Sequence, residues 1–129
     1  MDERTEKNRE IALRLVKAVG SGDMPVVESL VHPDLDWWLN GMGHLDHDAF
    51  IASLHMLHSA KSGGFTVVTS TAEADRVVIE MVGHFEYEDG RVYDNNYCEL
   101  MTIKDGLVYK VHAFFDIAAA EKAFAAMLN

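Results

Sequence analysis

The chain has 129 residues, of which 49% are hydrophobic. That composition excludes an intrinsically disordered chain, and the length is enough to bury a substantial core, so we expect residues 1–129 to form a single domain. Its 21 acidic and 11 basic residues give a formal net charge of −10. A chain with this charge repels polyanions, which argues against nucleic acid or an anionic membrane as a partner.

The single cysteine, Cys98, excludes an internal disulfide and is typical of a reducing, intracellular compartment. The N-terminal sequence MDERTEKNRE contains no apolar run that could act as a secretion signal or an anchor. No window approaches the roughly 18 uninterrupted apolar residues of a membrane span. We therefore expect a soluble, cytoplasmic protein.

The first half of the chain predicts three helices and one short strand. Apolar residues at helical spacing run through residues 5–20, and a glycine-rich sequence ends that helix. Asp23 is placed to cap a shorter helix, MPVVESLV, whose first turn tolerates a proline. A short strand, LDWWLNG, follows. Asp46 or Asp48 can then cap a third helix, DAFIASLHMLHSA.

The second half predicts a β-meander. The hydrophobic pattern switches to a period of two and is interrupted by AEAD, EDGR and KDGL. Asp-Gly pairs between alternating runs are typical of tight hairpins. We predict strands at about 64–72, 76–88, 91–104 and 107–116, followed by a last helix, IAAAEKAFAAML. Helices followed by a meander indicate an α+β fold with the helices on one face of a curved sheet.

The two Asp-Gly turns also predict which side chains share a face of the sheet. If both are two-residue loops, Glu99 lies opposite Glu80 on one side and His112 on the other. The same register places Asn95 opposite Asp116. A loop of a different length would shift the register by one residue and turn the side chains of a strand to the other face.

This register assigns the two faces of the strand at 91–104. Asn96 and Cys98 would be its polar points on the helix-covered face, and sparse polar groups in an apolar surface are typical of a small-molecule pocket. We therefore expect both residues to bind a ligand. Tyr97 and Glu99 would point outward, toward solvent or toward a second copy of the chain, so we expect a homodimer through the outer sheet face.

Three local sequences carry a resemblance to a known superfamily. GDMPVVESLVHPDLDWW, DGRVYDNNY and KDGLVYKVHAFFD are similar to the SnoaL-like and ketosteroid-isomerase-related branches of the nuclear-transport-factor-2-like superfamily. The resemblance covers nearly the whole chain. It implies a cone-shaped, curved antiparallel sheet wrapped on three N-terminal helices, with a short C-terminal helix. It implies less about activity, because this fold hosts isomerases, dehydratases, cyclases, epoxide hydrolases and non-catalytic binders.

The resemblance to ketosteroid isomerase fails at its functional positions. That mechanism needs a carboxylate base and an oxyanion hole made of a tyrosine and a protonated acid. In a gapless comparison the tyrosine falls at Leu15, the base at Leu39 and the acid at Cys98. We therefore expect no ketosteroid isomerase activity.

The resemblance to SnoaL-like cyclases implies a role for Asp116. These enzymes use an aspartate near the end of the last strand as acid and base, and FFDIAAAEKAF is similar at that point. Asp116 is therefore the candidate catalytic residue. The alternative is that Asp116 caps the helix beginning at Ile117, where a carboxylate satisfies free N–H groups.

Further candidate ligand contacts lie on the strand LDWWLNG, around the third helix and at the end of the last strand. Trp37 and Trp38 are adjacent on a strand and must point to opposite faces, so one of them can line a pocket. The full set of expected ligand-binding residues is Trp37, Asn40, His44, His55, Asn96, Cys98 and Phe115. No metal motif, phosphate-binding loop or nucleotide fingerprint is present, so we expect neither a metal nor a cofactor.

Two functions remain open. The first is a lyase, isomerase or cyclase that acts on a hydrophobic small molecule by general acid/base chemistry, with Asp116 as the proton carrier. The second is a non-catalytic small-molecule-binding or dimeric interaction domain of the same fold. The isomerase groups missing at Leu15, Leu39 and Cys98 favour the second function, and the aspartate at position 116 favours the first.

Overall fold

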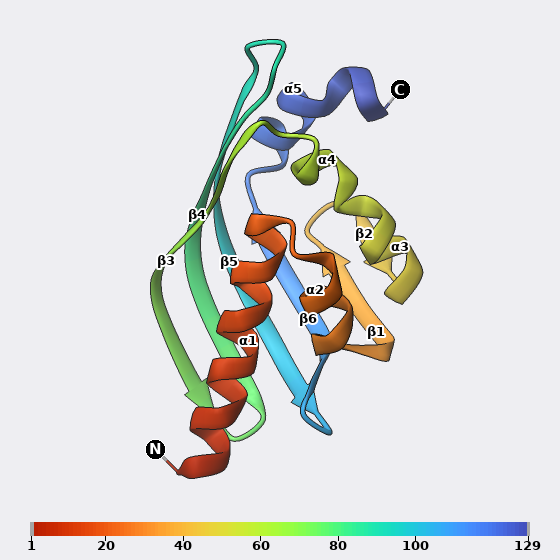
Figure 1. Cartoon of the computed structure of the whole chain (residues 1–129). Coiled ribbons are helices and arrows are strands. Elements are labelled where there is room, and N and C mark those ends of the chain that lie inside the picture. The colour runs from red at the N-terminus through yellow and green to blue at the C-terminus, as the bar shows by residue number, and fades with distance from the viewer. Residues whose placement is uncertain (1, 129) are drawn as a thin grey trace.

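The computed structural model describes the backbone of residues 2–128 and the side chains of residues 2–125. The helices are α1 (Glu3–Ser21), α2 (Met24–Leu30), α3 (His47–Ser53), α4 (His55–His58) and α5 (Ile117–Leu128). The strands are β1 (Val31–Leu39), β2 (Gly43–Leu45), β3 (Ser62–Glu73), β4 (Arg76–Glu86), β5 (Val92–Lys104) and β6 (Leu107–Phe115). The predicted α+β architecture, with helices on one side of a curved sheet and a short C-terminal helix, is confirmed (Figure 1).

The strands form one six-stranded sheet in the order β2-β1-β6-β5-β4-β3. Neighbouring strands are antiparallel except β1 and β6, which run parallel, so the sheet is mixed rather than purely antiparallel. β2 is a short edge strand that the sequence did not predict. β6 lies between β1 and β5, so the first and last strands of the chain are neighbours in the sheet.

The helices lie on the concave side of the sheet (Figure 1). Asp2 caps α1 by accepting a hydrogen bond from the Thr5 backbone N–H at 2.7 Å. The helix ends at Gly22, whose φ of +77° is the left-handed conformation that glycine adopts without strain. Asp23 and Asp46 cap α2 and α3, as their positions in the sequence predict. The third predicted helix is divided at Leu54 into α3 and α4.

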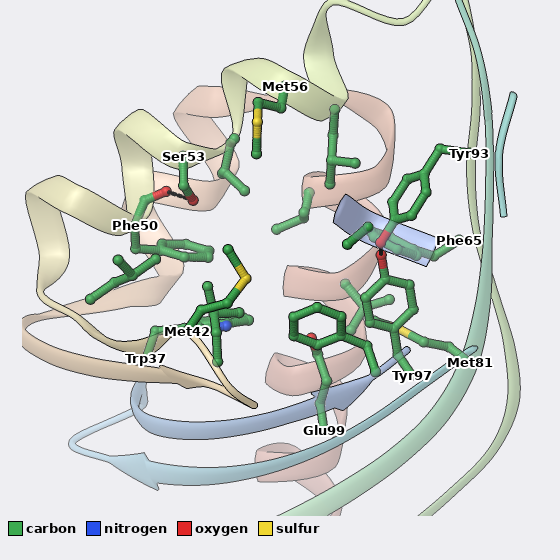
Figure 2. Close-up of a pocket in the computed structure, with 18 of the residues that line it drawn as sticks. Trp37, Met42, Phe50, Ser53, Met56, Phe65, Met81, Tyr93, Tyr97 and Glu99 are labelled. Carbon is green, nitrogen blue, oxygen red and sulfur yellow. Dashed lines mark hydrogen bonds between the residues drawn. The ribbon is translucent and has the colours of Figure 1, made fainter. Parts of the chain in front are cut away.

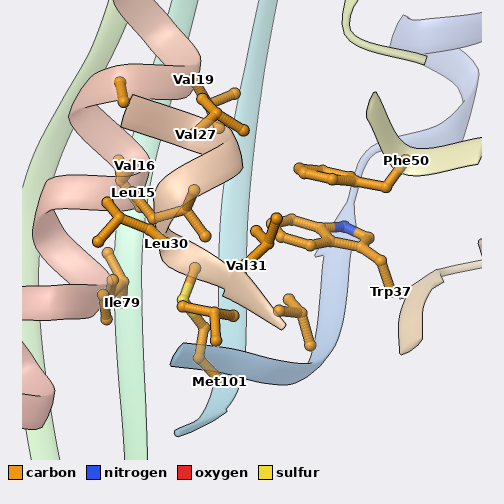
Figure 3. Close-up of a cluster of buried hydrophobic side chains, with 14 of the residues drawn as sticks. Leu15, Val16, Val19, Val27, Leu30, Val31, Trp37, Phe50, Ile79 and Met101 are labelled. Carbon is orange, nitrogen blue, oxygen red and sulfur yellow. The ribbon is translucent and has the colours of Figure 1, made fainter. Parts of the chain in front are cut away.

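Apolar side chains of α1, α2 and the sheet form the main core (Figure 3). Leu15 on α1 and Ile79 on β4 are fully buried. Trp37 on β1 stacks on Phe50 of α3, with ring centroids 4.1 Å apart, and this pair joins the core to the α3 end of the molecule. None of the helices in the described residues is both long and apolar enough to cross a membrane.

Candidate functional site

The register of β5 differs from the predicted one and turns the strand over. Glu99 pairs with Ile79 of β4 and Ala113 of β6, rather than with Glu80 and His112. Both neighbours are buried residues of the concave face, so Glu99 also points inward. The predicted faces of β5 are therefore exchanged, whereas those of β4 and β6 are as predicted.

Two local features cause this shift. The β4–β5 connection has five residues, 87–91, between the paired residues Glu86 and Val92, and within it the Tyr87 backbone N–H donates to the Arg91 carbonyl. The β5–β6 turn is the expected two-residue loop that pairs Lys104 with Leu107, but a bulge follows it. At this bulge Tyr109 has no paired residue on β5. The register of β6 against β5 therefore shifts by one residue, and Glu99 pairs with Ala113.

Asn96 and Cys98 consequently lie on the outer face of the sheet. They pair with Val82 and Glu80 respectively, and neither lines the cavity described below. The prediction that they provide the polar points of an internal pocket is wrong. Tyr97 and Glu99, which the sequence assigned to the outer face, take that place.

An apolar cavity of about 150 Å³ lies between the helices and the concave face of the sheet. Its wall combines leucine, valine and methionine side chains with aromatic rings, including Trp37, Phe50, Phe65 and Phe115 (Figure 2). The polar residues that line it are Ser53, Tyr93, Tyr97, Glu99 and Glu121. An apolar wall with few polar groups is the usual build of a small-molecule site.

Glu99 is the buried acid of this cavity. The Glu99 side chain points from the sheet into the cavity (Figure 2). The residue is only 5% exposed. Among the described residues its carboxyl group has no hydrogen-bond or ion-pair partner. Burial without a compensating charge penalises the ionised form and raises the pKa of Glu99 to about 8. The carboxyl group is therefore mostly protonated at neutral pH and ionises just above it.

Tyr93 and Tyr97 form the second polar element of the cavity. Their hydroxyl oxygens lie 2.7 Å apart and share the hydrogen bond that is drawn as a dashed line in Figure 2. Asn95, on the same face of β5 between them, donates a hydrogen bond to the Tyr93 hydroxyl at 2.8 Å. Desolvation by burial raises the pKa of both tyrosines, so both remain phenols.

The third polar group is Ser53. Its hydroxyl hydrogen is already used in a hydrogen bond to the Phe50 backbone carbonyl at 2.7 Å. Glu121 lies on α5 and is exposed to solvent. Glu99 and the tyrosine pair are therefore the polar groups best placed to act on a ligand.

Gly83 provides space for this arrangement. It occupies a position of the concave face of β4 that would otherwise carry a side chain, opposite Asn95. A Cβ atom at Gly83 would lie 3.0 Å from the Phe65 ring and 3.2 Å from the Tyr97 ring. The missing side chain lets both rings pack against the strand.

The predicted ligand contacts are only partly assembled by the structure. Trp37 and Phe115 line the cavity. Asn40 instead ties β1 to β6 by donating to the Phe115 carbonyl at 3.2 Å. His44 and His55 are exposed; His44 contacts the Asp36 carboxylate and His55 contacts the Ala52 carbonyl. Neither histidine lines the cavity.

Asp116 caps α5. Its carboxylate accepts a hydrogen bond from the Ala119 N–H at 3.2 Å, and the residue is exposed and outside the cavity lining. The structure thus places Asp116 in its alternative role, as a helix cap, and not as an acid facing the cavity.

The positions compared with ketosteroid isomerase need one correction. Leu15 and Leu39 line the cavity and leave it without the tyrosine and base of that enzyme. Cys98, however, points outward, and its neighbour Glu99 supplies an inward-facing acid. The cavity therefore has an acid that the gapless comparison missed. Among the described residues no group of three metal-binding side chains is assembled.

The fold and cavity define a class of protein: a cone of helices and curved sheet enclosing an apolar pocket with one buried acid. The family model of the SnoaL-like domain matches residues 12–111. The chain therefore belongs to the SnoaL-like family. A comparison with curated protein sequences found no match.

Solved structures show the same fold at low sequence identity. PrhC from Penicillium brasilianum superposes with a TM-score of 0.83 at 18% identity, covering 98% of this chain and 93% of PrhC. A putative SnoaL-like polyketide cyclase from Jannaschia sp. CCS1 has a TM-score of 0.81 at 21% identity, covering 98% and 96%. TerC, co-crystallised with polyporic acid, has a TM-score of 0.75 at 20% identity, covering 92% and 98%.

Proposed function

We propose that the chain is a small-molecule enzyme of the lyase, isomerase or cyclase type, in which Glu99 carries a proton to and from a hydrophobic ligand. The observation that carries this proposal is a buried carboxyl group without a partner, facing an apolar cavity. A general acid or base works best when its pKa lies near the working pH. A pKa of about 8 meets that condition for Glu99.

The proposed step needs no co-reactant. The ionised Glu99 carboxylate takes a proton from a carbon next to a ligand carbonyl, and the electron pair of the broken C–H bond moves to the carbonyl oxygen. The protonated Glu99 then returns the proton to the same or a different carbon. The apolar wall excludes water, which would otherwise solvate the carboxylate and weaken it as a base.

The cavity limits the ligand's size and polarity. A dry apolar cavity of roughly 150 Å³ accepts a molecule the size of benzene, so the resting cavity of this chain suits one ring. The stacked rings of Trp37 and Phe50 offer a flat wall for it. The names of two structural neighbours, a putative polyketide cyclase and TerC with polyporic acid, also point to carbonyl-bearing small molecules.

Hydrogen exchange tests the proposal without knowledge of the natural substrate. Acetophenone and 1-indanone are incubated with the protein in D₂O, and deuterium at the carbon beside the carbonyl is followed by proton NMR. We expect exchange above the buffer rate, increasing as the pH rises through about 8. Glu99→Gln, which cannot ionise, should lower the protein-dependent rate by roughly 10²- to 10⁴-fold.

The matched control is Glu88→Gln, which removes an exposed carboxylate from the β4–β5 loop, away from the cavity and the outer sheet face, and should leave the rate unchanged. Equal rates for wild type and Glu99→Gln would contradict the role of Glu99. Binding of the ketones with no exchange above buffer would instead leave the alternative function, a non-catalytic small-molecule-binding domain.

We also propose that a second copy of the chain covers the outer face of the sheet. Val82 and Phe114 lie on this face and are 38% and 40% exposed, which is unusual for large apolar side chains in the middle of a sheet. The same face carries groups of both signs: the acid Glu80, and the bases Arg76 and Lys110, which lie on either side of Thr102. A two-fold axis can bring such groups together in pairs.

A further inference from the structure

Asn95 is a buried amide whose orientation is fixed by its neighbours. It is 6% exposed. Its Oδ1 accepts from the backbone N–H groups of Asn96 at 2.8 Å and Asp116 at 2.9 Å, and its Nδ2 donates to the Asp116 carbonyl at 2.9 Å. Rotating the amide by 180° would set donor against donor and acceptor against acceptor. Nδ2 is therefore the atom that faces Tyr93.

This orientation determines the hydrogen count of the tyrosine pair. The Tyr93 oxygen accepts from Asn95, so Asn95 consumes neither hydroxyl hydrogen. The two hydroxyls share one hydrogen bond, at 2.7 Å, and that bond uses one of their two hydrogens. The other hydrogen has no acceptor among the described residues, whichever tyrosine carries it.

The described neighbours of the pair are mainly aromatic, and beyond the tyrosine–tyrosine bond none of them accepts a hydrogen bond from either hydroxyl. Aromatic rings pack around both tyrosines: Phe65 lies 5.4 Å from Tyr97 and Phe124 lies 4.8 Å from Tyr93, measured between ring centroids. Both tyrosines also line the cavity. A buried O–H hydrogen without an acceptor costs free energy that a ligand oxygen can recover.

We infer that Asn95, by donating to Tyr93 instead of accepting from it, leaves one hydroxyl hydrogen of the Tyr93–Tyr97 pair available to a ligand, and that the cavity selects ligands with a hydrogen-bond-accepting oxygen at that place. The class is a neutral carbonyl or quinone on an apolar ring. The inference rests on the proposed function, since it concerns the same ligand. Tyr97 and Glu99 are two residues apart on one strand, about 7 Å along it, so a small ligand can touch both.

The inference is tested by binding rather than turnover. Acetophenone is compared with α-methylstyrene, which replaces the carbonyl oxygen by a CH₂ group at nearly the same shape, and both dissociation constants are measured by NMR titration. The readout is the ratio of the two constants, corrected for the partition of each probe into an apolar solvent. We expect the wild type to prefer acetophenone by roughly 3- to 10-fold in this corrected ratio.

The hydrogen count predicts an unusual pattern across variants. Tyr93→Phe and Tyr97→Phe should each keep the preference, because one hydroxyl with one uncommitted hydrogen remains. The double variant should lose it. Asn95→Asp should also lose it although both tyrosines remain, because an aspartate carboxylate accepts from Tyr93 and the pair then has no hydrogen to spare. Asn95→Ala removes the amide without adding an acceptor and should keep the preference.

A preference that survives in the double variant overturns the inference, as does a preference that survives in a folded Asn95→Asp protein. If Asn95→Asp does not fold, the double variant decides alone, since both substitutions keep the aromatic rings. The proposed function fails separately: exchange that is absent or independent of Glu99 refutes it, whether or not the acceptor preference exists. The wild type can also catalyse Glu99-dependent exchange and yet show no preference for the acceptor. That result refutes only the role of the tyrosine pair and Asn95.

Discussion

Glu99 couples the stability of the fold to pH. Its pKa rises from the ordinary 4.5 to about 8 in the native state, because burial disfavours the carboxylate. Between these values the native protein holds a proton that the unfolded chain has released. The contribution of Glu99 to stability is therefore complete below about pH 4.5 and is lost as the pH rises through about 8.

We expect the free energy of unfolding of the wild type to fall relative to that of Glu99→Gln as the pH rises from 5 to 8. The difference should change by at most about 1.4 kcal/mol per pH unit, because glutamine keeps the shape of a protonated glutamate but does not titrate. Urea unfolding of both proteins at several pH values measures it. Glu88→Gln serves as the control, and pH profiles that stay parallel for wild type and Glu99→Gln would refute the buried, unpartnered state of Glu99.

At the scale of elements, Asp116 lies at the junction of β6 and α5. Its substitution distinguishes two roles for this residue, helix cap and proton carrier. If its carboxylate acts only as the cap of α5, Asp116→Ala should lower the free energy of unfolding by roughly 0.5–2 kcal/mol, whereas Asp116→Asn, which retains a capping oxygen, should cost little. Ketone exchange should be unchanged in both variants. Thermal unfolding and the exchange assay provide the two measurements. A loss of exchange by orders of magnitude in Asp116→Asn would restore Asp116 as the proton carrier.

The helices and the β5–β6 turn were predictable from the sequence because their signals are local. Asp2 was not anticipated as a cap, but Asp23 and Asp46 were, and the Asp-Gly loop before Leu107 has the predicted length. Strand register depends on interactions outside the turn. In the β4–β5 loop, Tyr87 is buried and its hydroxyl donates a hydrogen bond to the Met56 carbonyl. Met56 is distant in the sequence, so the local sequence does not predict this contact.

The site was missed for the same reason. Because the predicted register was wrong by one residue, Asn96 and Cys98 were assigned to the pocket in place of Tyr97 and Glu99. One signal could have prevented it: although Asn95 and Glu99 interrupt the pattern, the odd-numbered face of β5 carries Tyr93, Tyr97, Met101 and Ile103, whereas the other face has only Val92 and Leu100 as large apolar residues. That pattern within the strand indicates an inward face independently of the turns at its ends.

At the scale of the whole molecule, the outer sheet face predicts an assembly. We expect light scattering after size-exclusion chromatography to give twice the 14.4 kDa mass of one chain. Replacing Val82 or Phe114 by glutamate places charges against their two-fold copies and should yield monomers. Ketone exchange by these monomers would show whether the cavity works without a partner. A wild type that remains monomeric at about 100 µM would contradict the proposed dimer.

The parallel pairing of β1 with β6 has a consequence for synthesis on the ribosome. Residues 31–39 have no partner on that side until residues 107–115 have been made. Until then, the sheet lacks the strand that joins β1 to β5, and the core lacks the buried β6 residues Val108, Val111 and Ala113. The sheet can therefore be completed only late in translation, when β6 inserts between β1 and β5, which precede it in the chain.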